Sequence, residues 1–432
     1  MIGRLGVGRG TRNALLAVTM VLIVAGIVSY LLPRFREKAP IRVGILHSLS
    51  GTMAISETSV VDATVLAIEE INDRGGLLGR RIEPIVVDGR SDSATFAKEA
   101  RALIVDEKVS VIFGCWTSAC RKTVKPIVEQ FRHLLFYPVQ YEGLESSRHI
   151  VYTGAAPNQQ IIPAVKWSFE TIGTKFFLVG SDYVFPRVAN QIIRDQVRAL
   201  RGEILGEEYI LLGSDDVEPI VRKIVETRPD AILNTINGDS NIAFFRQLRA
   251  AGITPDRIPT VSFSITENEL QGMDLLSMRG DYASWNYFQS LEGEANAAFL
   301  DRFRRRYGAG RTTSDPMEAA YFGVHLWAQA VADAETDEVG TVREMIRRQS
   351  WGAPEGVVYI DPENLHTWKT VRIGRIDEKG QFDIVWTSGR PVRPVPFPIF
   401  RSTDEWLEFL EGLRREWGGW VNPGVPSPGE RP

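Results

Sequence analysis

The stretch Gly114-Cys115-Trp116-Thr117-Ser118-Ala119-Cys120-Arg121-Lys122 decides the fold class of this chain. It follows the apolar run 109–113, which is typical of a buried strand, and it precedes 123–128, which is typical of a helix. A strand that ends in Gly-x-x-Thr-Ser and opens a helix places hydroxyl groups and free backbone N–H groups at the start of that helix. Ligands of open α/β sheets bind just beyond the carboxyl ends of the strands. The pattern therefore predicts a pocket here, with Trp116 as a wall and Ser118 as a hydroxyl contact.

A second strand end of the same kind is Phe136-Tyr137-Pro138-Val139-Gln140-Tyr141-Glu142-Gly143, which follows an apolar strand at 134–137. Because parallel strands present their carboxyl ends at one edge of a sheet, Tyr137 is predicted to stand near Trp116. The two strand ends together predict a small pocket with aromatic walls and a hydroxyl floor.

Strands and helices alternate on both sides of this stretch. The first half has strands at 41–46 and 82–87 before it, and a second series of similar size begins after residue 158. Such alternation predicts parallel, doubly wound sheets. The last third is rich in predicted strands, at 356–360, 369–376 and 381–386, and a helix at 403–417 ends the predicted body. The fold class is therefore α/β, with two lobes.

Composition favours an ordinary globular protein, since 44% of the 432 residues are hydrophobic and 24% are charged. This length suggests two domains, possibly three. The net charge of -4 gives no indication of nucleic acid as a partner. The two cysteines, Cys115 and Cys120, are interpreted as buried thiols, and a disulfide across the strand-to-helix turn is the alternative.

The sequence predicts binding rather than catalysis. It contains no G-x-S-x-G, H-E-x-x-H, phosphate-loop or G-x-G-x-x-G pattern, and its five histidines are dispersed without the spacing of metal ligands. A catalytic pair of carboxylates remains an alternative, because aspartates and glutamates are plentiful in the sequence. No metal and no cofactor is predicted.

The uncharged, apolar run 14–32 is long enough to span a bilayer as a helix. It lacks a small-residue cleavage site and has no neighbouring cysteine for lipid attachment. An uncleaved membrane anchor is therefore favoured, and a cleaved signal peptide is the alternative. Arginines on both sides leave the orientation nearly undecided.

The two strand-end blocks resemble the type I periplasmic-binding-protein family, in its urea and short-chain amide branch. The resemblance extends from about 41 to about 407 and recurs in blocks at 152–160, 180–183, 315–321 and 366–370. It implies two doubly wound parallel-sheet lobes joined by a three-segment hinge, with crossings near 157, 288 and 350 and the body exported from the cytoplasm. The implied domains are an anchor and tether (1–39), lobe 1 (41–157 and 289–350), lobe 2 (158–288 and 351–417) and a flexible tail (418–432).

The resemblance also implies a ligand-binding set. Its members are Trp116, Ser118, Tyr137, Gln140, Tyr183, Asp239, Tyr287 and Glu318. Tyr183 would close over the ligand from the second lobe, and Asp239 is the candidate acceptor for ligand N–H groups, with Glu318 a weaker one. Each residue also has a structural explanation: the aromatic residues could pack the lobes, Ser118 could only cap a helix, and Asp239 could be a turn residue.

Urea or another short-chain amide is the ligand that the resemblance implies. The Val139-Gln140 pair is closer to the urea-transporter branch than to the amide-sensing regulators, which resemble Tyr-Pro-Thr-Pro-Tyr-Glu-Gly at this place. The implied partners are ABC permease subunits, together with the membrane through the N-terminal helix. An amide sensor that signals to a partner protein is the alternative, and an amidase is disfavoured by the absent nucleophile motifs.

Overall fold

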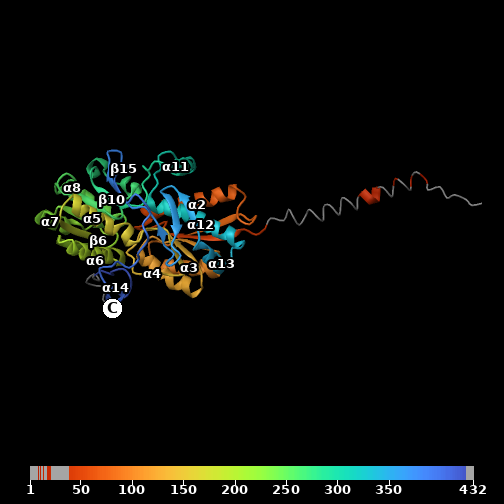
Figure 1. Cartoon of the computed structure of the whole chain (residues 1–432), viewed down its shortest axis with the longest axis horizontal. Helices are drawn as coiled ribbons and strands as arrows, with labels where there is room; N and C mark the ends of the chain where they lie inside the picture. The colour runs from red at the N-terminus through yellow and green to blue at the C-terminus, as the bar shows by residue number, and fades with distance from the viewer. Residues whose placement is uncertain (1–7, 9, 11–12, 14–16, 21–37, 425–432) are drawn as a thin grey trace, which may run out of the picture.

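The computed structural model describes residues 8, 10, 13, 17–20 and 38–424. Figure 1 shows two lobes side by side, with α5 to α8 around one sheet and α2, α3, α12 and α13 around the other. Within this described part, no helix combines the length and the apolarity needed to cross a membrane. The predicted span 14–32 lies for the most part outside the described residues and stays a prediction.

The first lobe is built on a five-stranded sheet in which all neighbouring strands are parallel. Its order is β2 (Ile82–Asp88), β1 (Ile41–His47), β3 (Ile112–Gly114), β4 (Leu135–Tyr137), β5 (Ile150–Tyr152). Among its helices α2 (Ala54–Asp73) packs on α12 (Asp315–Ala334), and α3 (Ser93–Val105) packs on α4 (Ser118–Gln130). The lobe also contains α11 (Glu294–Tyr307) and α13 (Val339–Ile346). The predicted parallel α/β arrangement is confirmed here.

The second lobe contains a seven-stranded mixed sheet. Its order is β15 (Phe382–Thr387), β14 (Arg372–Ile376), β10 (Tyr282–Trp285), β9 (Thr260–Ser262), β8 (Ala231–Thr235), β6 (Lys175–Ser181), β7 (Glu203–Ile210). The five strands from β10 to β7 are parallel, and β14 and β15 add an antiparallel edge. Its helices are η2 (Pro157–Gln159), α5 (Ile161–Thr171), α6 (Val184–Ala199), α7 (Glu218–Thr227), α8 (Ser240–Ala250), α9 (Glu267–Leu270), α10 (Leu275–Met278) and α14 (Thr403–Trp417).

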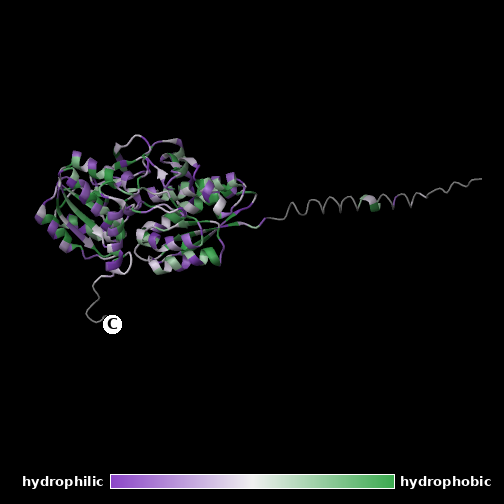
Figure 2. Cartoon of the chain, turned by 60° about the horizontal axis from the view of Figure 1, so that its bottom comes forward, coloured by the Kyte–Doolittle hydropathy of each residue, from purple (hydrophilic) through white to green (hydrophobic). Residues whose placement is uncertain are grey.

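A continuous apolar run explains why β6 lies inside this sheet, between β8 and β7. Phe176 and Leu178 belong to one hydrophobic cluster, and Phe177 and Val179 belong to another. Because successive side chains of a strand point to opposite faces, β6 needs apolar residues at every position when helices cover both faces. Figure 2 shows the same pattern for the whole molecule, with hydrophobic strands inside each lobe and hydrophilic residues on the outer helices.

The third crossing between the lobes lies later than predicted. Strands β11 (Ser350–Ala353), β12 (Gly356–Ile360) and β13 (Thr367–Trp368) form a separate antiparallel sheet. Val358 and Leu365, expected in lobe 2, belong to the hydrophobic cluster of the first lobe. The chain therefore leaves that lobe at about 369–371, where the next strand, β14, pairs with β10. We propose lobe boundaries corrected in this way.

The first part of the predicted tail is attached to the second lobe. Gly418 ends α14 in the left-handed conformation that glycine adopts readily. Beyond it, the amide of Val184 donates to the Trp420 carbonyl at 3.0 Å, and the Asn422 amide donates to the Asp182 carbonyl at 3.1 Å. We call residues 418–424 the C-terminal strap. It lies along the residues on either side of Tyr183.

Candidate functional site

The two lobes close on each other along the carboxyl ends of their parallel strands. Hydrogen bonds that cross the gap join Ser56 to Glu269 at 2.7 Å, Asn268 to Ser59 at 2.7 Å, Gln140 to the Phe263 carbonyl at 2.8 Å, and Thr52 to Asp239. The strap adds a further contact, because the Lys122 ammonium lies 5.1 Å from the centre of the Trp420 ring. The side chains at these strand ends are therefore enclosed between the lobes.

The turn that carries Trp116 is fixed by its backbone and by a disulfide. A Cβ atom on Gly114 would lie 2.1 Å from the Leu46 carbonyl oxygen, so only glycine fits there. Cys115 has a φ of 69°, in the left-handed region that non-glycine residues rarely adopt. Cys115 and Cys120 form a disulfide across the turn, so the interpretation as free thiols was wrong. Their Cα atoms lie 6.0 Å apart, inside the usual range for a disulfide, because the turn folds back onto the first turn of α4.

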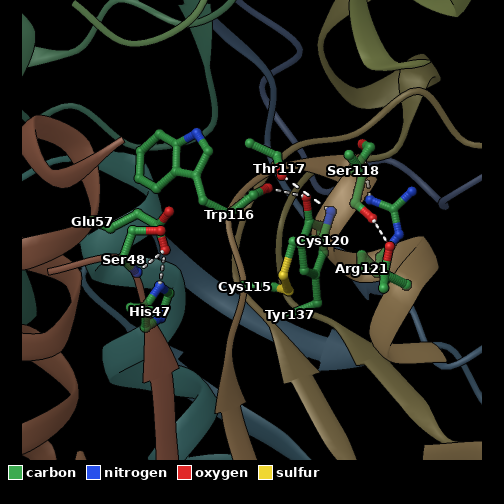
Figure 3. The surroundings of a disulfide bond; sticks show 12 residues. His47, Ser48, Glu57, Cys115, Trp116, Thr117, Ser118, Cys120, Arg121 and Tyr137 are labelled. Carbon is green, nitrogen blue, oxygen red and sulfur yellow. Dashed lines mark hydrogen bonds and ion pairs between the residues drawn. A yellow bond between two sulfur atoms is a disulfide. The ribbon is translucent and has the colours of Figure 1, made fainter. Parts of the chain in front are cut away.

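Trp116 and Tyr137 meet at the ends of β3 and β4, as the two strand-end blocks predicted. The Tyr137 hydroxyl donates to the Trp116 carbonyl, and both side chains are buried. Figure 3 shows the indole of Trp116 on the side of the turn where Glu57 and Ser48 lie, and Ser118 on the opposite side. The indole N–H of Trp116 has no hydrogen-bond partner among the described residues. A buried donor without a partner is costly, at about 1–3 kcal/mol, unless a ligand or water satisfies it.

Gln140 and Tyr183 complete the enclosed group. The Gln140 amide N–H reaches the second lobe at Phe263, while its side-chain oxygen is a second buried polar atom for which the described residues provide no partner. Tyr183 comes from the second lobe and is 1% exposed. Burial, and next the negative charges that Tyr137 and Glu142 can carry, raise the pKa of Tyr183 well above its ordinary value. Tyr183 also packs in one hydrophobic cluster with Ala119 and Leu144 of the first lobe, so it lies against that lobe.

A buried charged group lies behind Ser118, and we call it the Arg121 cluster: Ser118, Arg121, Lys122, Glu142 and Glu145. Arg121 is fully buried and donates to Glu145 at 2.8 Å, to the Ser118 hydroxyl at 3.0 Å and to Glu142 at 3.0 Å. Lys122 donates to Glu145 at 2.9 Å. Burial alone raises the pKa of Glu145, but Arg121 and Lys122 bring it well below the usual range.

Arg121 also contacts two aromatic rings. Its guanidinium carbon lies 4.7 Å from the centre of the Tyr137 ring and 4.3 Å from that of Tyr141. Such contacts stabilise a buried cation beyond its hydrogen bonds. The cluster therefore connects the wall residue Tyr137 to the start of α4.

Sequence reasoning did not single out several residues of this enclosed region. His47 and Ser48 follow β1, where the His47 ring nitrogen Nδ1 lies 2.9 Å from Glu57, and Glu57 also accepts from the Ser48 amide at 2.8 Å. The strand-end rule that found Trp116 could have found His47 and Ser48 too. Glu142 stands in the same block as Tyr137 and Gln140, but sequence alone does not show which way its side chain points.

Three predicted residues are not brought into this enclosed region. Asp239 is exposed on the rim, where it accepts from the Thr52 hydroxyl of the other lobe. Tyr287 belongs to the hydrophobic cluster of the first lobe, and its hydroxyl pairs with Asn296 at 2.7 Å and with Thr313 at 2.9 Å. Glu318 lies in a second buried charged group beside the hinge.

That second group ties the crossing segments together. The Lys369 ammonium donates to the Thr153 carbonyl at 3.1 Å and lies 3.2 Å from Glu355. Asp315 accepts from the Asn286 and Tyr287 amides, and the Glu355 amide donates to Glu318 at 3.1 Å. Burial, and next the charge of Glu355, raise the pKa of Glu318 well above its usual value. Glu318 therefore lies beside the segments that connect the two lobes.

The sequence is similar to those of known proteins. A family model described as periplasmic binding protein domain matches residues 41–403. The chain belongs to this family. Membership makes it a solute-binding protein of the type that serves ABC transporters, and not an enzyme. Within residues 38–424, no cluster of histidine, cysteine or acidic side chains is arranged to hold a metal ion.

Individual relatives agree on the fold and differ in what they bind. A Leu/Ile/Val-binding protein homolog of Brucella melitensis is 20% identical over 78% of this chain and 87% of its own. A solute-binding protein of R. palustris in complex with 4-hydroxybenzoate has a TM-score of 0.73 at 22% identity, covering 81% of this chain and 97% of its own. LivJ of Streptococcus pneumoniae in complex with isoleucine has a TM-score of 0.71 at 22% identity, covering 82% and 100%.

One further match is partial. A limonene hydroxylase of Geobacillus stearothermophilus is 31% identical over 143 residues, which are 32% of this chain and 26% of that protein. Because the chain spans only about a quarter of that relative, nothing of its activity is carried over. The urea and amide branch of the family stays a prediction.

Proposed function

We propose that this protein traps a small neutral amide, with urea as the leading candidate, between its lobes and delivers it to an ABC permease. The observation that carries the proposal is a donor and an acceptor, both buried and without a partner among the described residues, that follow neighbouring strands of the first lobe. They are the Trp116 indole N–H, a donor, and the Gln140 side-chain oxygen, an acceptor. A planar amide offers a carbonyl oxygen to the first and N–H groups to the second.

The walls of the enclosed region support the same class of ligand. Trp116, Tyr137 and Tyr183 provide flat faces, and each is at most 3% exposed in the closed structure. Closure brings Tyr183 from the second lobe against the first-lobe strand ends, so its contacts with a solute form only when the lobes shut. Specificity then follows from matching every buried donor and acceptor, since each mismatch costs about 1–3 kcal/mol.

Relatives that bind 4-hydroxybenzoate or isoleucine make carboxylates the competing ligand class. Calorimetric titration of the full chain with urea, acetamide, formamide, leucine and 4-hydroxybenzoate separates the two classes. Saturable binding of urea or an amide, with both carboxylates silent, is the expected result. Binding of leucine or 4-hydroxybenzoate alone would refute the amide assignment.

Two variants locate the site. Trp116→Ala removes a wall and the unpartnered donor, so we expect roughly 10- to 100-fold weaker binding, equivalent to about 1.4–2.7 kcal/mol. Tyr287→Phe is the matched control, because Tyr287 lies in the first-lobe core and bonds only Asn296 and Thr313 through its hydroxyl. An equal loss of affinity in both variants would mean that the site is misplaced.

The membrane attachment is proposed on the run 14–32, with the body outside the cytoplasm. Cell fractionation tests it: the full chain should sediment with membranes and resist extraction by high salt. A chain that begins at residue 38 should be released.

A further inference from the structure

The Arg121 cluster bears directly on which solutes the interlobe site accepts. Its two cations, Arg121 and Lys122, face two carboxylates, Glu142 and Glu145, so its net charge is zero. The next cation along α4, Lys125, is half-buried and also acts on Glu145. All four charged groups of the cluster are buried, and the ion pairs between them leave no cation unopposed.

Ser118 is the member of the cluster at the start of α4. Its hydroxyl has one hydrogen, which it donates to Glu142, and it accepts a hydrogen bond from Arg121. Figure 3 shows the hydroxyl turned toward Arg121 rather than toward Trp116. With its hydrogen used in this way, Ser118 can offer a further partner only an acceptor lone pair.

A helix N-terminus ordinarily favours an anion, because its N–H groups and its dipole both attract negative charge. At α4 the protein supplies that anion itself, since Glu142 accepts from Ser118, the first residue of the helix. A ligand carboxylate placed here would meet a second carboxylate and an acceptor-only hydroxyl. An amide N–H group would instead meet acceptors.

Tyr183 shows that this end of the cluster faces the gap between the lobes. It packs in the same hydrophobic cluster as Leu144 of the first lobe, two residues after Glu142. Ala119, which follows Ser118, packs in a hydrophobic cluster of the second lobe. The start of α4 therefore lies against the surface that closes over the solute.

We propose that Glu142, held by Ser118 and Arg121, is a specificity-determining residue that makes the interlobe site reject carboxylates and accept uncharged hydrogen-bond donors. This inference rests on the proposed interlobe site and deepens it. It assigns the rejection to one side chain rather than to pocket shape.

Isosteric pairs test the inference, because each pair keeps the shape and changes the charge. The full chain is titrated with acetamide and acetate, isobutyramide and isobutyrate, and benzamide and benzoate. We expect wild type to bind at least one amide 100-fold or more tightly than its carboxylate partner. Glu142→Gln should lower that ratio at least tenfold. A wild type that binds the carboxylate as tightly as the amide overturns the inference, and the solute-binding role stands.

A matched control separates the position of the charge from its amount. Glu145→Gln removes the same charge from the same cluster but leaves Ser118 donating to Glu142. We expect Glu145→Gln to keep the wild-type ratio. An equal loss of discrimination in both variants would assign the effect to net charge and refute the role of Glu142.

The failure of the amide assignment has a different signature. If wild type binds none of these amides, the proposed ligand class fails, and the carboxylates alone decide the role of Glu142. Carboxylate binding that appears in Glu142→Gln and is absent from wild type supports that role. The absence of carboxylate binding from both refutes it.

Ser118→Ala, which leaves every charge paired, is the substitute variant if Glu142→Gln does not fold. We expect Ser118→Ala to weaken amide binding without allowing carboxylates to bind. Carboxylate binding by this variant would refute the acceptor-only role of Ser118.

Discussion

Arg121 offers the sharpest test of how this structure is held together. Its side chain is fully buried, makes three charge-assisted hydrogen bonds and lies against two aromatic rings. Arg121→Met keeps much of the side-chain volume and removes the charge and every donor. Glu142 and Glu145 then keep ion pairs with Lys122, at 3.5 Å and 2.9 Å, and Glu145 also keeps the more distant charge of Lys125.

Removing one partner of a buried ion pair costs about 3–5 kcal/mol, because the remaining charge stays buried without compensation. We expect Arg121→Met to lower the free energy of unfolding by that amount. Adding Glu142→Gln removes the stranded charge, so the double variant should recover roughly 1–3 kcal/mol. The free energy recovered measures the contribution of the stranded carboxylate, and the remainder measures the lost packing and hydrogen bonds.

Equilibrium unfolding in guanidinium chloride, followed by tryptophan fluorescence and by circular dichroism, measures both values. Urea is avoided because it is the proposed ligand, and a ligand stabilises the folded state. A loss below about 1 kcal/mol for Arg121→Met would mean that water reaches the cluster and that it is not buried as described. A double variant as unstable as the single one would refute the account based on the stranded charge.

The remaining predictions concern other parts of the molecule. The Cys115–Cys120 disulfide closes a short loop with a sequence separation of 5. The double variant Cys115→Ala/Cys120→Ala should therefore lower the free energy of unfolding by about 2 kcal/mol and loosen the turn that carries Trp116. An unchanged free energy of unfolding under oxidising conditions would contradict this prediction. Burial raises the pKa of Glu267 to about 8, so the folded state keeps a proton that the unfolded state releases near pH 4.5, and the free energy of unfolding should fall as pH rises through that window. Glu267→Gln should reduce this slope by about 1.4 kcal/mol per pH unit between those two pKa values, whereas Asp281 and Glu355, whose pKa values are also raised, keep their own contributions. A slope equal to that of wild type would show that Glu267 does not contribute to it. A chain that ends at Gly418 loses the rest of the strap beside Tyr183. We expect this chain to bind the solute roughly 3- to 10-fold more weakly and to release it faster in stopped-flow measurements. An unchanged rate of release would show that the strap is not needed to hold Tyr183 in place.

Much of the fold follows from local pattern. The stretch around Trp116 predicts a strand, a turn and a helix because its apolar run, its glycine and its Thr-Ser pair each favour that structure independently. Thr117 does cap α4, since its hydroxyl accepts from the Cys120 amide at 3.1 Å. The alternating pattern likewise predicts parallel sheets, because strands buried on both faces must be apolar throughout.

Pairing between distant segments was decided by tertiary structure alone. Strands β12 and β14 have similar apolar character, yet Val358 of β12 packs in the first lobe and Ile373 of β14 packs in the second. Nothing local distinguishes them, because the choice depends on which surface is left uncovered. The edge of β10 pairs with β14, whereas β12 pairs with β11, which packs on α12 of the first lobe. This dependence is why we propose a third crossing at about 369–371 rather than at the predicted position near 350.

The candidate site likewise depends in part on local sequence pattern and in part on tertiary structure. The sequence by itself determined which strand ends carry aromatic and hydroxyl residues, because position after a strand is a local property. It predicts Trp116, Ser118 and Tyr137 there, and their role in binding stays a prediction. Only the tertiary structure decided that Tyr287 packs in a core and that Glu318 lies beside the segments that connect the lobes. It alone also decided that Glu142 accepts the hydrogen bond that the Ser118 hydroxyl donates. The direction of a side chain, and the partner that neutralises its charge, depend on residues that are distant in the chain and adjacent only after folding.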